Sequence, residues 1–167
     1  MLFETDKTRI SLAAADDINS IVEIYNSNPS FLMAHLDRER VNTQWVVDEM
    51  NTMKEIGFIS SKVVLKNSYT TIGVLDFLVN EESYLSLLML HSDNRYLGLG
   101  SEVYKGLEYF AKVHKSKRIR IDVVTSYDKN VLNFWTSKGF NIIDQVELNW
   151  SGKSLQAVKM KKILANG

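Results

Sequence analysis

Residues 88–101, the most informative part of the sequence, read Leu88-Met-Leu-His-Ser-Asp-Asn-Arg95-Tyr-Leu-Gly98-Leu-Gly100-Ser101. An apolar strand pattern gives way to a polar connection and then to the apolar face of a helix. Two glycines one residue apart at the helix start let the backbone approach a ligand closely, and the unpaired N–H groups of the first turn can bind an anion. Arg95 adds a charge suited to phosphate oxygens. The segment predicts a phosphate or pyrophosphate site, the alternative being a tight turn needed for packing.

Two common phosphate motifs do not fit this segment. In a dinucleotide-binding motif the glycines follow the strand almost at once, and a third small residue comes three positions later. Here the polar connection of seven residues, Ser92 to Gly98, intervenes and Val103 holds the third position. A P-loop needs Gly-Lys-Ser/Thr, but Gly100 is followed by Ser101-Glu102. Both nucleotide-binding folds are therefore excluded.

Apolar periodicity predicts an α/β (α+β) chain with one mixed, mostly antiparallel, twisted sheet of about seven strands and about four helices. Strands are expected at 8–12, 58–66, 70–79, 84–91, 118–124, 140–150 and 153–163. Helices are expected from Asp16 or Asp17 to about Asn28, and over 38–53, 99–114 and 129–138. The central strand, helix, strand unit from 84 to 124 is long enough for two parallel strands with a right-handed crossover.

The composition argues against several classes of partner and site. A length of 167 residues suits a single domain, and 20 basic against 20 acidic residues give no reason to expect nucleic acid or an anionic membrane. The chain has no cysteine, and its three histidines show no metal-ligand spacing. No signal peptide or long apolar run is evident. We expect a cytoplasmic protein without a metal site.

Two motifs carry a resemblance to a known family. Arg95-Tyr-Leu-Gly98-Leu-Gly100 matches the pattern Arg/Gln-x-x-Gly-x-Gly/Ala, and Asn133-Phe-Trp-Thr-Ser-Lys-Gly139-Phe140 is similar to Phe-Tyr/Trp-x-x-x-Gly-Phe. Both patterns, in this element order, occur in the GNAT (GCN5-related N-acetyltransferase) superfamily, which the chain resembles over nearly its whole length. The resemblance implies a single GNAT acetyltransferase domain over 1–167.

The resemblance also implies the cofactor, acetyl-CoA, and the residues that bind it. Its pyrophosphate would lie on the segment formed by Arg95, Tyr96, Leu97, Gly98, Leu99, Gly100 and Ser101. Its pantetheine arm would lie like an extra strand beside Leu88, Met89 and Leu90, where two parallel neighbours separate and leave a strand edge exposed. Trp135 of the second motif and Asp128, seven positions earlier, complete the expected cofactor-binding set.

Catalysis would proceed by direct attack of a neutral primary amine on the thioester, with an N–H near Leu90 polarising the carbonyl. The family's glutamate, fourteen residues before Gly98, is replaced by Tyr84; Glu82 could act instead through a water, unless it belongs to a solvated turn. The family's tyrosine acid is Trp135, and the Asn seven positions earlier is Asp128. Tyr127 could supply the proton, or it could be an aromatic residue near a helix cap. The expected catalytic residues are thus Glu82, Tyr84 and Tyr127.

The acceptor, an amine of a small molecule or a peptide, is not specified by the sequence. The resemblance places the following residues around it: Tyr25, Phe31, Met33, His35 and Trp45. For Tyr25 and Trp45 the alternative is a place in the core. The loop 27–35 is expected to form a lid. Asp37, Glu39 and Glu49 could recognise a cation, the alternative being an ordinary solvated helix face. The alternative hypothesis is a CoA-binding module or acyl-CoA sensor with little or no turnover. A purely structural interaction protein is a weaker third option, and a homodimer is left open.

Overall fold

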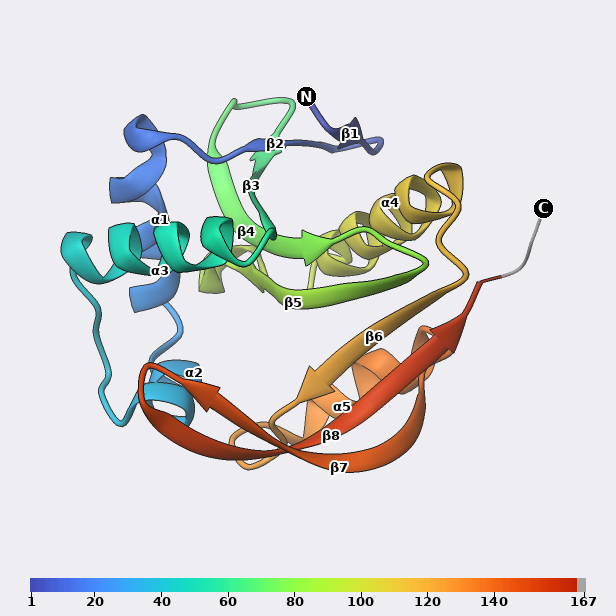
Figure 1. Cartoon of the computed structure of the whole chain (residues 1–167). Helices are drawn as coiled ribbons and strands as arrows, with labels where there is room; N and C mark the ends of the chain where they lie inside the picture. Colours follow the sequence, from blue (N-terminus) through green and yellow to red (C-terminus); the bar gives the residue numbers. More distant parts are fainter. Residues whose placement is uncertain (165–167) are drawn as a thin grey trace.

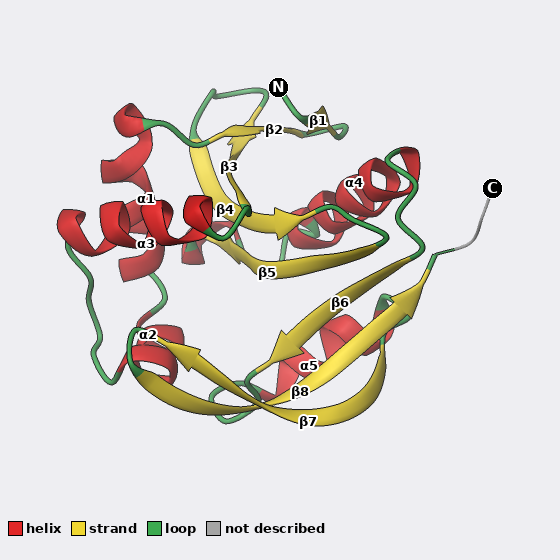
Figure 2. Cartoon of the chain, viewed as in Figure 1, coloured by secondary structure: helices red, strands yellow, loops and turns green. Residues whose placement is uncertain are grey.

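The computed structural model describes residues 1–164 and contains one mixed sheet with helices on both faces (Figures 1 and 2). The strands are β1 Phe3–Glu4, β2 Thr8–Leu12, β3 Ile59–Leu65, β4 Thr71–Leu78, β5 Glu82–Leu90, β6 Arg118–Val123, β7 Asn141–Trp150 and β8 Lys153–Ile163. The helices are α1 Ile18–Asn26, α2 Pro29–Leu36, α3 Thr43–Glu55, α4 Leu99–Val113 and α5 Lys129–Ser137. Short 3-10 turns lie at Ala15–Asp17 and Ser92–Asn94.

The sheet has the order β1-β2-β3-β4-β5-β6-β8-β7, and only β5 and β6 are parallel. Their pairing covers three residues of each strand, Glu82 to Tyr84 with Arg118 to Arg120. Beyond them the two strands diverge toward the side on which α2 and α3 lie (Figure 1). The predicted mixed, mostly antiparallel sheet with a central parallel unit is confirmed, and the sheet gains one short strand, β1, that was not predicted.

Two apolar cores lie on opposite faces of the sheet. Leu75 and Phe77 of β4 pack in the core that contains α4 and α5, whereas Val74 packs in the core that contains α1 and α3. Because side chains alternate along a strand, Asp76 shares the face of Val74. The fold therefore places one acidic side chain within the apolar face beneath α1 and α3.

The segment expected as a lid loop, 27–35, is largely helical, and that expectation was wrong. Helix α2 begins at Pro29, which fits the first helical turn because its N–H would be unpaired there in any case. Leu32 and His35 are buried, so the helix is part of the folded body rather than an exposed loop.

The next helix begins later than the predicted residue 38. Its first turn is capped by the side chain of Asn42, which accepts a hydrogen bond from the N–H of Trp45 at 2.9 Å. Residues 38 to 42 are consequently a connection. Val41, which began the apolar pattern of the longer helix, is buried from this connection and not from α3.

Gly73 keeps the end of β5 in place, and its substitution should destabilise the fold. A Cβ at this position would lie 2.7 Å from Leu90 Cδ2 and 2.9 Å from the carbonyl oxygen of Met89. We expect Gly73→Ala to lower the free energy of unfolding by about 1–3 kcal/mol. Chemical denaturation measures this, with Ser68→Ala in the exposed β3–β4 turn as a control that should change it by less than about 0.5 kcal/mol. Equal stability of the two variants would contradict the role assigned to Gly73.

Candidate active site

The connection between β5 and α4 presents a row of unpaired backbone donors. Tyr96 has φ +62° and Gly98 has φ +76°, so the chain turns twice through the left-handed region before α4 begins. Among residues 1–164, the N–H groups of Tyr96 to Ser101 donate to no protein acceptor. Successive N–H groups in such a turn form a concave anion site, which the dipole of the following helix strengthens. The geometry fits a pyrophosphate at the predicted segment.

Lys138 adds a positive charge that the sequence analysis missed. Its Nζ donates a hydrogen bond to the hydroxyl of Ser101 and lies 5.2 Å from the ring centre of Phe134. Arg95 lies exposed at the other end of the same segment. In the sequence, a lysine directly before Gly139 indicates only the end of a helix, and in the structure Lys138 is the C-cap of α5. Its place beside α4 depends on how the two helices pack on the sheet.

The end of β5 provides a free strand edge. The N–H of His91 donates to the carbonyl of Ile72 on β4 at 2.7 Å, and backbone groups alternate in direction along a strand. Those of Leu88 and Leu90 therefore face the side on which β6 has diverged. The amide of Asn28, at the end of α1, donates to the carbonyl of Leu90 at 3.1 Å and anchors this edge. The open edge expected at Leu88 to Leu90 is present, with the side chain of Met89 buried in the α1/α3 core.

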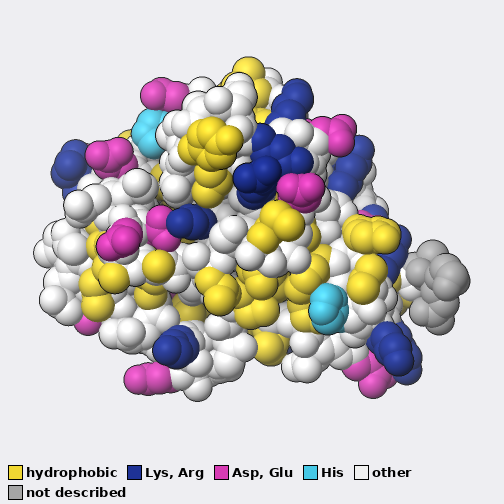
Figure 3. All heavy atoms as spheres, turned by 90° about the horizontal axis from the view of Figure 1, so that it is seen from above, with side chains coloured by type: hydrophobic (Ala, Val, Ile, Leu, Met, Phe, Trp, Pro, Cys, Tyr) yellow, Lys and Arg dark blue, Asp and Glu magenta, His cyan; other side chains and the backbone are white. Residues whose placement is uncertain are grey.

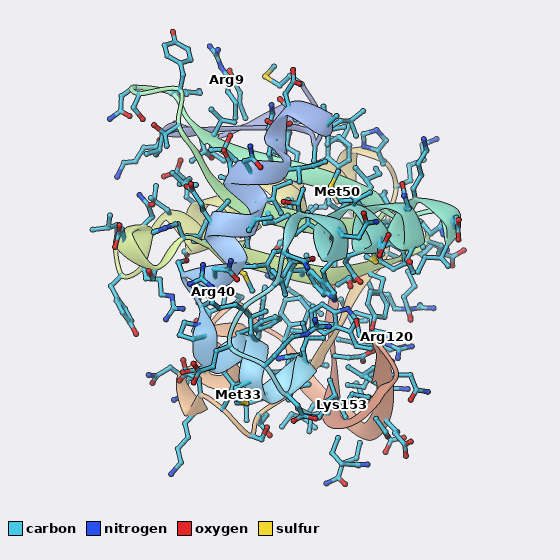
Figure 4. The ribbon with its side chains drawn as sticks, turned by 90° about the vertical axis from the view of Figure 1, so that its left-hand side faces the viewer. Arg9, Met33, Arg40, Met50, Arg120 and Lys153 are labelled. Atoms are coloured by element: carbon cyan, nitrogen blue, oxygen red, sulfur yellow. The ribbon has the colours of Figure 1, made fainter. Side chains whose placement is uncertain are left out.

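The divergence of β5 and β6 opens a cleft of about 900 Å³. Helices α2 and α3 and the end of the β7–β8 hairpin surround it. Figure 4 views this part of the molecule from the left-hand side of Figure 1, with Met50 of α3 above and Arg120 and Lys153 below. Lys153 joins the hairpin to α2 by donating to the carbonyl of Ala34 and to Asp37, at 3.1 and 2.6 Å.

Glu82 is held away from the cleft. Its carboxylate pairs with Arg118 at 2.5 Å and with Lys161 at 2.8 Å, and it is not among the residues that line the cleft. Hydrogen bonds from Lys161 and Arg118 hold the pKa of Glu82 below its usual value. A carboxylate stabilised in this way is a poor proton acceptor, so the structure gives Glu82 a structural pairing role.

Tyr84 lines the cleft, but its hydroxyl donates a hydrogen bond to Asp122. Burial, followed by the hydrogen bond to Asp122, raises the pKa of Tyr84 well above its usual value. Arg120 lies 5.2 Å from the ring centre of Tyr84 and pairs with Asp122. The three side chains form a network at the narrow end of the cleft, where β5 and β6 are still paired.

Tyr127, just before α5, and Trp135 of the second motif lie on the cleft wall. Tyr127 lines the cleft beside Phe31, at a ring-centre distance of 5.8 Å, and burial raises its pKa to about 12. Trp135 is buried against Tyr104 and also lines the cleft. Asp128 caps α5 by accepting a hydrogen bond from the N–H of Asn130 at 2.8 Å. Tyr127 thus keeps its proton at neutral pH and faces the cleft, as a proton donor must.

A buried acid in this cleft, Asp76, was not predicted. Among the residues that the structure describes, its Oδ1 is the one buried side-chain oxygen or nitrogen without a hydrogen-bond partner. Burial, together with the charge of Glu49, raises the pKa of Asp76 to about 7. A hydrogen bond with Ser60 acts in the opposite direction. In the sequence, the signal that could have identified Asp76 was its position as the single acid within the apolar run Ile72 to Leu78. A carboxyl group poised near neutrality is suited to proton transfer.

Glu49 of α3 lines the same cleft, and the sequence analysis named it as a possible recognition residue. Its Oε1 accepts a hydrogen bond from the indole N–H of Trp150 at 2.8 Å, across from β7. Burial raises the pKa of Glu49, against the lowering effect of that hydrogen bond. Asp37 and Glu39, the other two acids named with it, are exposed.

Other features of the described residues bear on function. Within 1–164, no group of three or more His, Cys, Asp or Glu side chains could hold a metal ion. None of the helices in that range has the length and apolarity needed to cross a membrane. On the face shown in Figure 3, Lys and Arg side chains lie beside Asp and Glu side chains.

Comparison with known proteins identifies the fold. No protein-family model matches the chain, and no curated protein is similar to it in sequence. Solved structures match it closely in shape. An acetyltransferase from Thermus thermophilus has a TM-score of 0.73 at 18% identity, covering 94% of this chain and 97% of that one. A GNAT superfamily phosphinothricin acetyltransferase from Sinorhizobium meliloti, in complex with AcCoA, has a TM-score of 0.68 at 15% identity, with 96% and 90% covered.

A ribosomal-protein-alanine N-acetyltransferase from Brucella melitensis also matches, with a TM-score of 0.65 at 18% identity over 93% of this chain and 99% of that one. The protein therefore has an acetyltransferase-type α/β fold. More particularly, it has the fold of the GNAT superfamily, as the two sequence motifs implied.

The raised pKa of Asp76 makes stability depend on pH. Since the folded protein binds this proton more tightly than the unfolded chain, the contribution of Asp76 is most favourable below pH 4 and is lost as pH rises through about 7. We expect Asp76→Asn to stabilise the free protein by about 1–3 kcal/mol at pH 8, because it removes an incompletely paired buried charge. The difference should shrink toward pH 5. Denaturation at the two pH values measures it, and a less stable variant at pH 8 would contradict the assignment.

Proposed function

We propose that the protein is an acetyl-CoA-dependent N-acetyltransferase. One arrangement carries the proposal: unpaired N–H groups of Tyr96 to Ser101 continue into the free edge of β5, which opens into a cleft that contains the buried carboxyl of Asp76. An anion site, an extended strand edge and a proton acceptor thus lie in succession. These are the parts that transfer of an acyl group from a CoA thioester to an amine requires.

The residues present fit acetyl-CoA, which would supply the activated acetyl group. The diphosphate would lie on the N–H groups of Tyr96 to Ser101, between the charges of Arg95 and Lys138. The amides of the pantetheine arm would pair with the backbone of Leu88, which faces the gap left by β6, while the Leu90 carbonyl accepts from Asn28. The acetyl group would then lie in the cleft, within the space bounded by Tyr127 and Trp135.

The chain's own groups can account for the proton movements. Asp76 would take a proton from the acceptor's ammonium or from the attacking amine, and the N–H of Leu90 would donate to the carbonyl oxygen as negative charge develops on it. The new bond forms between the amine nitrogen and the acetyl carbon, and the carbon–sulfur bond breaks. A thiol with a pKa near ~8.5 leaves readily as thiolate and can take its proton from solvent, while the hydroxyl of Tyr127 can donate a hydrogen bond to the sulfur.

The second candidate is a CoA-binding module with little or no turnover. It is favoured by Trp135, whose indole cannot lend a proton, and by the pairing of Glu82 with Arg118 and Lys161. Both candidates bind CoA, and they differ in whether thiol is released. The cysteine-free composition is compatible with the reducing cytoplasm for either activity.

Binding of acetyl-CoA should depend on the conformation at Gly98. At ~100 times its dissociation constant the ligand should stabilise the protein by about 2.7 kcal/mol, or several degrees in melting temperature. Gly98→Glu should abolish this shift by placing an anion at the pyrophosphate site. Gly57→Glu is the matched control, since Gly57 also has positive φ and open space around it but lies in the α3–β3 turn. Equal shifts in both variants would exclude this site.

Gly100→Ala separates binding from folding. Its added Cβ would meet only Leu90 Cδ1 at 3.8 Å and Phe134 Cζ at 4.0 Å, so the free protein should be as stable as before or slightly more stable. The methyl group nevertheless occupies the space through which phosphate approaches the backbone. We expect the dissociation constant of CoA, measured by calorimetry, to rise about tenfold or more, and unchanged affinity would count against the site.

Asp76 should control the rate and its pH dependence. For the wild-type protein we expect kcat/KM to rise with pH through about 7, as Asp76 loses its proton. Asp76→Asn should lower kcat by about 10² to 10⁴ and remove that rise while leaving CoA affinity unchanged. Glu82→Gln is the comparison variant and should keep the pH profile. An unaltered profile in Asp76→Asn would assign the proton to another group.

A further inference from the structure

The cleft side of α3 and β4 carries more acidic than basic side chains. Ionisable lining residues with formal charges are Arg38, Asp48, Glu49, Asp76 and Asp122. Asp122 is neutralised by Arg120, whose nitrogens lie 2.9 and 3.1 Å from it. Arg38 is exposed on the connection after α2, and no ion pair to Asp48, Glu49 or Asp76 is present within 1–164. The cleft thus has an excess of negative charge.

One carboxyl oxygen of Asp76, Oδ1, in addition lacks a hydrogen-bond donor. Buried polar atoms are almost always paired, so an unpaired carboxyl oxygen that lines a cleft indicates a donor brought by a ligand. The charged side chain that raises its pKa is Glu49, also an acid. An ammonium or amine group would satisfy both carboxyl groups, whereas a second carboxylate would be repelled by them.

Aromatic rings form the wall beside these acids. Trp150 lies between Phe31 and Trp45, at ring-centre distances of 5.6 and 6.2 Å, and its N–H holds the Glu49 carboxylate. His35 stacks on Phe31 at 3.8 Å and donates from Nδ1 to the carbonyl of Phe31 at 2.8 Å. Burial, and to a smaller extent the charge of Lys153, lower the pKa of His35 to about 4 against the raising effect of its hydrogen bond to Phe31, so this ring carries no charge at neutral pH. The wall therefore consists of neutral rings with one fixed carboxylate.

Rings and unpaired carboxyl groups select a particular kind of amine. We infer that the acceptor is a primary amine on an apolar, ring-bearing body without a carboxylate, an arylalkylamine, with its nitrogen at Asp76 and Glu49 and its ring against Trp150 and Phe31. Rings bury apolar bodies and attract an ammonium through their faces. An α-amino acid is disfavoured because its carboxylate would lie next to two acids, with only the exposed Arg38 to pair with. This inference rests on the proposed transferase activity.

A flexible polyamine fits the same cleft less well. It would need a second buried carboxyl group at the far end of its chain, and the remaining unpaired acid, Asp48, is exposed on α3 and accepts a hydrogen bond from Gln44 at 2.8 Å. Spermidine therefore serves as a competing acceptor in the test.

The decisive experiment compares acceptors that differ by one carboxylate. Thiol release from saturating acetyl-CoA is measured at pH 8 with 2-phenylethylamine against phenylalanine, tryptamine against tryptophan, and with ethanolamine and spermidine. We expect kcat/KM for each arylalkylamine to exceed that of its amino acid by about 10², since like charges brought together cost several kcal/mol. A ratio below about threefold would overturn the inference, and so would a preference for spermidine or ethanolamine over 2-phenylethylamine.

Trp150 provides the matched variants. Trp150→Leu removes the ring and should raise KM for 2-phenylethylamine about tenfold while changing KM for acetyl-CoA little. Trp150→Phe restores a ring without the N–H and should recover part of that loss. Equal KM values for 2-phenylethylamine in wild type and Trp150→Leu would show that the ring of Trp150 does not contact the acceptor.

A binding measurement separates this inference from the proposed function. Calorimetry on the protein loaded with CoA should detect 2-phenylethylamine but not phenylalanine, even if no acceptor is acetylated. Absence of a CoA-induced thermal shift, or CoA binding without thiol release from any amine, would overturn the transferase proposal. Turnover of other amines without binding of 2-phenylethylamine would overturn the acceptor class alone.

Discussion

The architecture of this protein depends on a parallel strand pairing that ends after three residues. Beyond Tyr84, β5 continues without β6 beside it, so Leu88 and Leu90 present backbone groups to open space. A strand edge inside a protein is a liability unless something covers it. Here the divergence also creates the cleft, and the next turn of chain aligns the N–H groups of Tyr96 to Ser101. The anion site, the edge and the cleft are thus consequences of one break in the sheet.

In the proposed function, recognition through main-chain atoms would explain why the fold is shared at such low identity. An N–H group or a strand edge requires backbone conformation, and only positions such as Gly98, at φ +76°, restrict the residue type strongly. Side chains around the site can vary as long as the sheet breaks at the same place. Similarity in shape with 15 to 18% identity, and no match to a family model, agrees with that constraint.

The cleft also shows how a site can oppose stability. Asp76 is buried with one oxygen unpaired beside Glu49, an arrangement that disfavours the ionised form and weakens the folded state near neutral pH. Apolar packing of Val74 on the same strand, against α1 and α3, keeps Asp76 in position. A buried and incompletely paired carboxyl group is expected where a protein must hold that group ready for a ligand.

Local patterns in the sequence determined most of the fold, since strands, helices and the glycine turn at Gly98 depend on residues close in the chain. Local signals failed where two interpretations were compatible with them: Pro29 ends one helix but also begins another, so the pattern predicts a loop where α2 lies. Local signals could not assign the roles of Glu82 and Asp76. Glu82 pairs with Lys161, and Asp76 is buried beneath α3, so both roles depend on elements far apart in sequence. Charge, desolvation and access are properties of the assembled surroundings. Only the tertiary structure could therefore decide which acid is neutralised in an ion pair and which lies unpaired in the cleft.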